Sequence, residues 1–105
     1  PTERQWERAA AGGGRKARAY PWGNRWDSNR VNAKWTVGQT SAVGIYPRGA
    51  SKDEGVHDLS GNVWEWTAET YDGSQVADDA SEVPRAVRGG SWNRYADYCR
   101  AAYRN

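Results

Sequence analysis

Apolar residues follow a helical period at the start of the chain. Trp6, Ala9 and Ala10 are spaced so that they share one face of a helix. Thr2 and Gln5 have the spacing of a capping box, in which a hydroxyl and an amide bond the free backbone N–H groups of the first turn. Glycines at 12–14 interrupt the pattern. We therefore predict a helix that begins after Thr2 and ends at these glycines.

A two-residue period marks a second element at 63–67, where tryptophans alternate with other residues. This is the period of a β-strand, and the Asp, Gly and Asn residues at 58–62 predict a tight turn before it. Trp64 and Trp66 then lie on one face and Glu65 on the other. Because buried aromatic residues dominate small cores, we predict that both tryptophans pack in the core and that Glu65 faces solvent.

The composition favours a loop-rich fold over a helical bundle. There are one Ile, one Leu, eight Val, and neither Phe nor Met, so seven Trp and six Tyr must supply most of the packing. Together with twelve Gly, this predicts an α+β fold with little regular secondary structure. A chain of 105 residues forms at most one domain. No apolar run approaches the roughly 20 residues of a membrane span, and no signal peptide is visible.

Charge is unevenly distributed although the net charge is only +2. Residues 53–82 contain no Lys or Arg, and residues 85–105 contain five Arg against Asp97 alone. The acidic block suits a hard cation; the alternative is a solvated surface with internal ion pairs. No nucleic-acid-binding module is recognised, so no nucleic-acid partner is expected. The acidic residues are Asp53, Glu54, Asp58, Glu65, Glu69, Asp72, Asp78, Asp79 and Glu82.

Four segments, in order, resemble the formylglycine-generating, sulfatase-modifying factor family. They are Pro-Thr-Glu-Arg-Gln-Trp-Glu-Arg-Ala-Ala at 1–10, Tyr-Pro-Trp-Gly-Asn at 20–24, Gly-Val-His-Asp-Leu-Ser-Gly-Asn-Val-Trp-Glu-Trp at 55–66, and Arg-Gly-Gly-Ser-Trp at 88–92. The resemblance implies an elaborated C-type lectin-like fold. It also implies that residues 1–105 are part of a single domain truncated at both ends, because the chain opens inside a family motif and stops before the usual closing Gly-Phe-Arg strand. Activity does not follow, since one fold serves catalysts and binding proteins alike.

The resemblance implies a structural calcium site. In the family, side chains at the positions of Asp58 and Glu65 and backbone carbonyls at Gly61 and Val63 hold the ion. Ca²⁺ takes roughly six to eight oxygen ligands, so these four groups and waters make a suitable set. The alternative is that Asp58 caps the turn and Glu65 pairs with an arginine. A second family site matches less well.

The resemblance does not extend to the formylglycine-generating chemistry. Catalytic members use two cysteine thiolates to hold Cu(I), a soft metal that prefers sulfur. Cys99 stands at one of these positions, but Arg94 stands at the other. We therefore expect no copper, and we expect Cys99 to be a small buried residue. His57 is the only histidine, which excludes a three-histidine iron centre within these residues.

The last residues favour a binding surface for a protein or another surface ligand. Tyr, Asn, Asp and Arg, which predominate there, are typical of adaptable recognition surfaces. The chain also resembles the variable proteins of diversity-generating retroelements, several of which share this fold. Those elements mutate adenines, and one or two adenine changes convert an Asn codon to Tyr, Asp or Arg. The candidate residues are Asn93, Arg94, Tyr95, Asp97, Tyr98, Tyr103 and Asn105.

Two alternatives stay open. The segment at 93–105 is an ordinary polar loop if no diversification occurs. The chain is an accessory or catalytic domain of a formylglycine-generating-enzyme-like oxidoreductase if active residues lie outside it.

Overall fold

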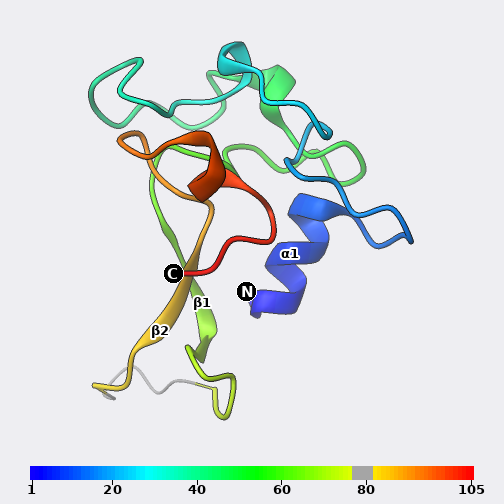
Figure 1. The fold of residues 1–105 in the computed structure, drawn as a ribbon, viewed down its shortest axis with the longest axis vertical. Helices are drawn as coiled ribbons and strands as arrows, with labels where there is room; N and C mark the ends of the chain where they lie inside the picture. Colours follow the sequence, from blue (N-terminus) through cyan, green and yellow to red (C-terminus); the bar gives the residue numbers. More distant parts are fainter. Residues whose placement is uncertain (77–81) are drawn as a thin grey trace.

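One helix and one two-stranded sheet are the regular elements, and loops make up most of the remainder (Figure 1). The computed structural model describes residues 1–76 and 82–105. Among these, the elements in chain order are helix α1 (Glu3–Ala11), 3-10 helices η1 (Ser28–Arg30) and η2 (Pro47–Gly49), strands β1 (Glu65–Thr70) and β2 (Arg85–Arg88), and 3-10 helix η3 (Ala96–Cys99). The predicted α+β, loop-rich class is confirmed, whereas its C-type lectin-like description stays a prediction.

Helix α1 forms as its sequence predicts. The Thr2 hydroxyl accepts the N–H of Gln5 at 3.0 Å, and the Gln5 amide oxygen accepts the N–H of Thr2 at 2.9 Å, which completes the capping box. At the other end Gly12 adopts φ +88° and donates its N–H to Arg8 at 2.8 Å. The inward face carries Trp6, Ala10 and Ala11, and Ala9 packs beside them.

Strands β1 and β2 form an antiparallel pair with an irregular register. Glu65 pairs with Arg88 and Trp66 with Val87, and a bulge precedes the pairing of Thr70 with Arg85. The Thr67 hydroxyl donates to the Ala86 carbonyl at 3.0 Å. Helix α1 contacts both strands. The face of the hairpin that packs against α1 is therefore its inner face.

The predicted core role of Trp64 and Trp66 is wrong. Trp66 is 67% exposed and Trp64 is half-buried, while Thr67 is fully buried. The reason is that Glu65 points toward α1, where its carboxylate accepts the indole N–H of Trp6. A two-residue period places Trp66 on the opposite face, and the tryptophan in the core comes from the helix instead.

Aromatic residues divide between two small cores and the surface. The first core surrounds Trp6 and contains Leu59, Ala101 and the inner alanines of α1. In the second, Tyr20 stacks on Trp22 with ring centroids 5.2 Å apart, and Trp26 meets both rings edge-on. This second core is completed by Val31, Ala33 and Cys99. The aromatic residues therefore supply the packing, as predicted, but several others remain exposed.

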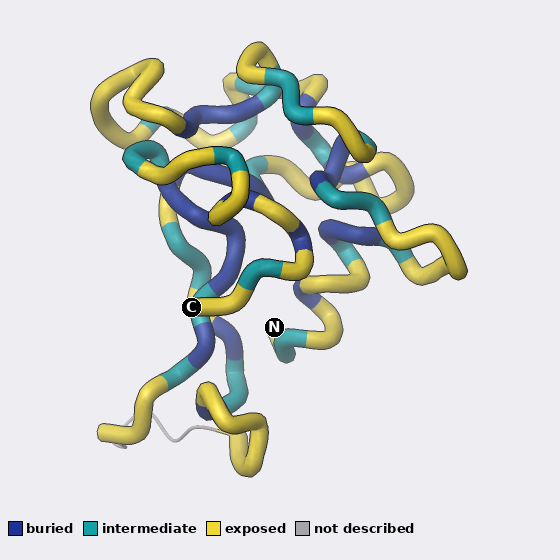
Figure 2. Tube along the Cα trace, in the orientation of Figure 1, coloured by how far each residue is buried: buried dark blue, intermediate teal, exposed yellow. Residues whose placement is uncertain are grey.

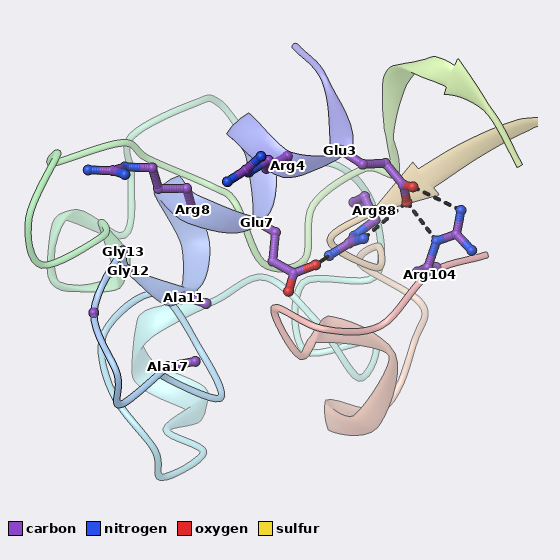
Figure 3. A pocket seen from close by; sticks show the side chains of 11 residues that line it. Glu3, Arg4, Glu7, Arg8, Ala11, Gly12, Gly13, Ala17, Arg88 and Arg104 are labelled. Carbon is purple, nitrogen blue, oxygen red and sulfur yellow. Dashed lines mark hydrogen bonds and ion pairs between the residues drawn. The ribbon is translucent and has the colours of Figure 1, made fainter. Parts of the chain in front are cut away.

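A buried guanidinium ties the two ends of the chain together (Figure 3). Arg88 lies over the Trp6 ring at 5.1 Å, and its side chain is only 1% exposed. It bonds the carboxylates of Glu3 at 3.0 Å and Glu7 at 2.5 Å and donates to the Ala101 carbonyl at 2.7 Å. Since a buried charge is stable only when it is paired and hydrogen-bonded, α1, β2 and the C-terminal segment must assemble together.

Part of the acidic block lies outside the described residues, namely Asp78 and Asp79. Within the described ranges no helix has the length and apolarity needed to cross a membrane.

The two tryptophans of opposite burial predict opposite effects on stability. Trp6→Ala should lower the free energy of unfolding by about 3 to 5 kcal/mol, because it opens a cavity under α1. Trp66→Ala should cost less than about 1 kcal/mol, because it removes an exposed side chain from a strand. Denaturant unfolding of the full-length protein, followed by far-ultraviolet circular dichroism, measures both. Equal losses would contradict the burial described above.

Candidate functional site

A turn at Gly61 and Asn62 holds three separate segments in place. Gly61 adopts φ +74°, and a Cβ there would lie 2.3 Å from the Asn32 carbonyl oxygen, so only glycine fits. Asn62 is also left-handed, at φ +62°. Its N–H bonds the Asn32 carbonyl and its carbonyl accepts the Trp92 N–H, both at 2.8 Å. Its side-chain amide bonds the backbone of Ser41 in both directions, at 3.0 and 3.2 Å.

The segment from 91 to 105 is fixed along its backbone. Cys99 and Ala101 are buried, and their backbone atoms bond the Ser60 hydroxyl at 2.7 Å and the Ala19 carbonyl at 2.8 Å. At its end, Asn105 exchanges two hydrogen bonds with Val87 of β2, at 2.9 and 3.1 Å. The backbone is therefore anchored at intervals, and the residues between the anchors turn outward.

The predicted site residues fall on this segment with unequal exposure (Figure 2). Tyr95 is 59% exposed and Tyr98 is 36% exposed. Asn93 and Tyr103 are half-buried, and Ser91 donates its hydroxyl proton to Asn93 at 2.8 Å. The remaining members, Arg94, Asp97 and Asn105, are exposed.

Ring contacts bring some of these residues together. Tyr98 and Tyr103 meet edge to face at 5.0 Å, and the Arg94 guanidinium lies 5.7 Å from the Tyr98 ring. Trp64 reaches Tyr103 at 6.1 Å, which explains why Trp64 is half-buried. Asn105 lies beside β2 through its backbone bonds instead. The segment thus presents a cluster of tyrosines and arginine with one outlying member.

Trp35 belongs to the same surface, and our sequence analysis did not include it. It is 48% exposed and meets the Tyr95 ring edge to face at 5.3 Å. Lys34 and Trp35 both adopt left-handed backbone, at φ +54° and +58°, which is rare for a bulky side chain. Their N–H groups bond the carbonyls of Arg94 at 3.0 Å and Trp92 at 2.9 Å. No sequence pattern signals this strained turn, because neither residue is Gly, Asn or Asp.

The two positions that correspond to the copper cysteines are different in kind. Cys99 is fully buried, and burial raises the pKa of its thiol to about 11. Arg94 is exposed. A buried neutral thiol at one position and an arginine at the other offer no pair of thiolates to a soft metal.

The predicted calcium residues lie around the start of β1 in separate contacts. The Asp58 carboxylate accepts the Gly44 N–H at 2.7 Å, so it fastens a neighbouring loop instead of capping its own turn. Glu65 bonds Trp6 instead of an arginine. Burial raises the pKa of Glu65, and the nearby charge of Asp58 raises it further. Among the described residues, no three His, Cys, Asp or Glu side chains gather in a metal-binding group.

The donor set still agrees in kind with a calcium ion. The turn and loop hydrogen bonds of the described residues leave the carbonyls of Gly61 and Val63 unused. Each of the two carboxylates also has an oxygen that these contacts do not occupy. The charge of Asp58 contributes to the raised pKa of Glu65, and a carboxylate that lies near a second negative charge is a setting in which a cation is favourable.

A pocket of about 490 Å³ lies beside α1 (Figure 3). Glu3, Glu7, Arg88 and Arg104 line it, and they bond one another. None of the predicted site residues lines this pocket. These four charged groups are therefore engaged in joining the chain ends, whereas Arg4 and Arg8 also line the pocket. The candidate site is the surface formed by 91–105 and Trp35.

A family comparison agrees with the motifs and the fold. The model of the sulfatase-modifying factor enzyme 1-like domain matches residues 1–105, the whole chain. The chain belongs to this family.

Among the family's curated proteins, the chain is 42% identical to the inactive C-alpha-formylglycine-generating enzyme 2 of Mus musculus over 92% of its own length. It is 31% identical to the formylglycine-generating enzyme of Thermomonospora curvata over 94% of its length. It spans only 32% and 40% of these two proteins.

A solved structure of the same fold is Treponema denticola variable protein 1. The TM-score is 0.75 at 28% identity, over 100% of this chain and 40% of that one. The family and the likeness to a variable protein, both inferred from sequence, are thus confirmed.

Proposed function

We propose that this domain is a non-catalytic binding module that recognises a protein or another surface ligand through residues 93–105. The observation that supports it best is the contrast between backbone and side chains in this segment. Cys99 and Ala101 fix the backbone, while Tyr95 and Tyr98 extend into solvent. Tyrosine offers a large, rigid contact area at low entropic cost, and a fixed backbone lowers the cost of binding further.

A non-catalytic role is supported by the same segment. Arg94 replaces one of the two cysteines that copper would need, and Cys99 is buried in its neutral form. A relative with 42% identity is itself described as inactive.

The alternative is an accessory or catalytic domain of a larger oxidoreductase, because the chain covers less than half of its relatives. A cysteine pair or a histidine cluster elsewhere in the full-length polypeptide would favour this alternative.

We propose further that the surface is a diversified one. The structural likeness to Treponema denticola variable protein 1 supports this, as does the outward position of residues whose codons differ from Asn by adenine changes. Diversification would alter the ligand without altering the frame that Cys99 and Ala101 anchor.

The gene decides the question of diversification. We expect a neighbouring reverse transcriptase gene and a template repeat that differs from codons 93–105 mainly at adenines. Sequencing of the locus shows whether they are present. A locus with neither feature would refute the proposed diversification but would not affect the proposed binding surface.

Selection with a randomised peptide library tests the binding surface. Peptides selected on the full-length protein should lose affinity by about 30-fold with Tyr95→Ala, since central aromatic anchors contribute about 2 kcal/mol or more. Tyr71→Ala is the matched control, because Tyr71 is an exposed tyrosine outside the candidate residues. Its ring lies against Arg104, which is not one of the candidate residues. Fluorescence anisotropy measures the dissociation constants. Binders that tolerate Tyr95→Ala, or respond equally to Tyr71→Ala, would refute the proposed surface.

A structural calcium ion held by Asp58, Gly61, Val63 and Glu65 is also proposed, because its carbonyls and carboxylates surround the turn that supports the recognition segment. With a dissociation constant of about 0.1 to 1 mM, 10 mM Ca²⁺ should stabilise the protein by about 1.4 to 2.7 kcal/mol. Binding should weaken as the pH falls toward the raised pKa of Glu65, because protonation competes with the ion.

Thermal unfolding with and without chelator measures this effect. Glu65→Gln should abolish the calcium-dependent shift, whereas Glu54→Gln, at an exposed acidic residue outside the set, should preserve it. A shift that survives Glu65→Gln, or no shift at 10 mM Ca²⁺, would be evidence against the site.

A further inference from the structure

We infer that the recognition surface binds an acidic polypeptide segment, and that Trp35 is a fixed anchor of that surface. This inference rests on the proposed binding function and specifies the chemistry of the partner.

The segment at 91–105 and the turn at Lys34 carry exposed cations that form no ion pair among the described residues. Lys34 and Arg94 are joined through their backbones at 3.0 Å, and both side chains are exposed. Arg100 is exposed as well, with its guanidinium 5.9 Å from the Tyr20 ring. In the described part of the chain, none of these three forms an ion pair with a carboxylate, whereas Arg104 pairs with Glu3 at 2.8 Å.

The opposing charge on this surface is small. Asp97 is the only acidic residue from 91 to 105. Three cations against one carboxylate leave a local excess of positive charge, although the chain as a whole is close to neutral. A partner with carboxylates would be attracted to this patch and could bond the arginines in bidentate fashion.

Apolar area favours a polypeptide over a polyanionic glycan. Trp35 and Tyr95 present an exposed edge-to-face pair at 5.3 Å. The loop that follows Trp35 adds three exposed aliphatic side chains, and Figure 1 shows this loop next to the one that leads into η3. These side chains are Val37, Val43 and Ile45. Aromatic anchors with arginine and an apolar surround are the composition of protein-binding hot spots.

The strained backbone of Trp35 indicates that the exposed position of its indole serves a function. A tryptophan in left-handed backbone is strained and persists only where its surroundings impose it. Hydrogen bonds from Lys34 and Trp35 to the 92–94 backbone impose it here. The indole gains little burial in return, since it is 48% exposed. Strain that places an apolar ring in solvent is explained by a partner that covers the ring.

The composition of selected peptides tests the acidic partner. Binders from the randomised library that depend on Tyr95 should be rich in Asp and Glu and contain an apolar side chain. If Tyr95-dependent binders are neutral or basic, the acidic partner is wrong while the binding surface stands. If no selected binder depends on Tyr95, the binding surface itself is wrong.

Defined probes then test the residues. An acidic peptide from the selection should bind about tenfold or more weakly to the triple variant Lys34→Gln, Arg94→Gln, Arg100→Gln, and its affinity should fall with added NaCl. Arg15→Gln, an exposed arginine in the loop after α1, is the matched control and should leave binding unchanged. The same peptide with Asn and Gln in place of Asp and Glu should bind the unmodified protein about as weakly as the acidic peptide binds the triple variant. Equal affinity of the neutral peptide would overturn the inference.

Trp35→Asn separates recognition from folding. Asn tolerates left-handed backbone, so the thermal midpoint should be unchanged or higher, while affinity for the acidic peptide should fall about 30-fold. Unchanged affinity would remove Trp35 from the surface. A heparin-derived oligosaccharide or phosphatidylserine vesicles that bind more tightly than the peptide, and are lost in the triple variant, would replace the polypeptide partner with another polyanion.

Discussion

The left-handed turn at Gly61 and Asn62 is the constraint on which the rest of the site depends. Gly61 allows the Asn32 backbone to approach to a distance that excludes any Cβ, and Asn62 uses that closeness to bond three segments at once. In this loop-rich chain, the turn supplies hydrogen bonds between segments that sheets would supply in a more regular fold. The described residues form only one α-helix, three short 3-10 helices and two strands, so polar backbone groups must find partners between loops.

This constraint explains how a loop surface can be firm enough for recognition. Asn62 receives the Trp92 N–H, and Trp92 in turn receives the N–H of Trp35. The chain of bonds runs from the turn to the aromatic pair without passing through a flexible side chain. A binding surface on such a frame loses little conformational entropy when a partner arrives.

The sequence predicted the local elements better than the packing between them. The sequence predicted helix α1 because a capping box and a glycine stop act within a few residues of each other. The sequence did not predict the exposure of Trp66, because a two-residue period shows which side chains share a face but not which face α1 covers. Trp35 escaped notice for a related reason, since its strained backbone is imposed by hydrogen bonds to residues far along the chain. The residue types at 93–105 predicted an exposed polar and aromatic segment, and its recognition role stays a prediction. The anchoring of this segment by Cys99 and Ala101 required the structure.

The hydrogen bonds of Arg88 also affect the order in which the parts of this surface fold. Arg88 bonds the Glu3 carboxylate across 85 positions of the chain, and Arg104 bonds the same carboxylate across 101 positions. Contacts of such long sequence separation close late and slow the folding reaction. During synthesis, Glu3 and Glu7 emerge with α1 and stay unpaired until Arg88 and Arg104 have been made. The segment at 93–105 includes Arg104, so it joins α1 only after the turn at Gly61 and Asn62, which supports it, has been made.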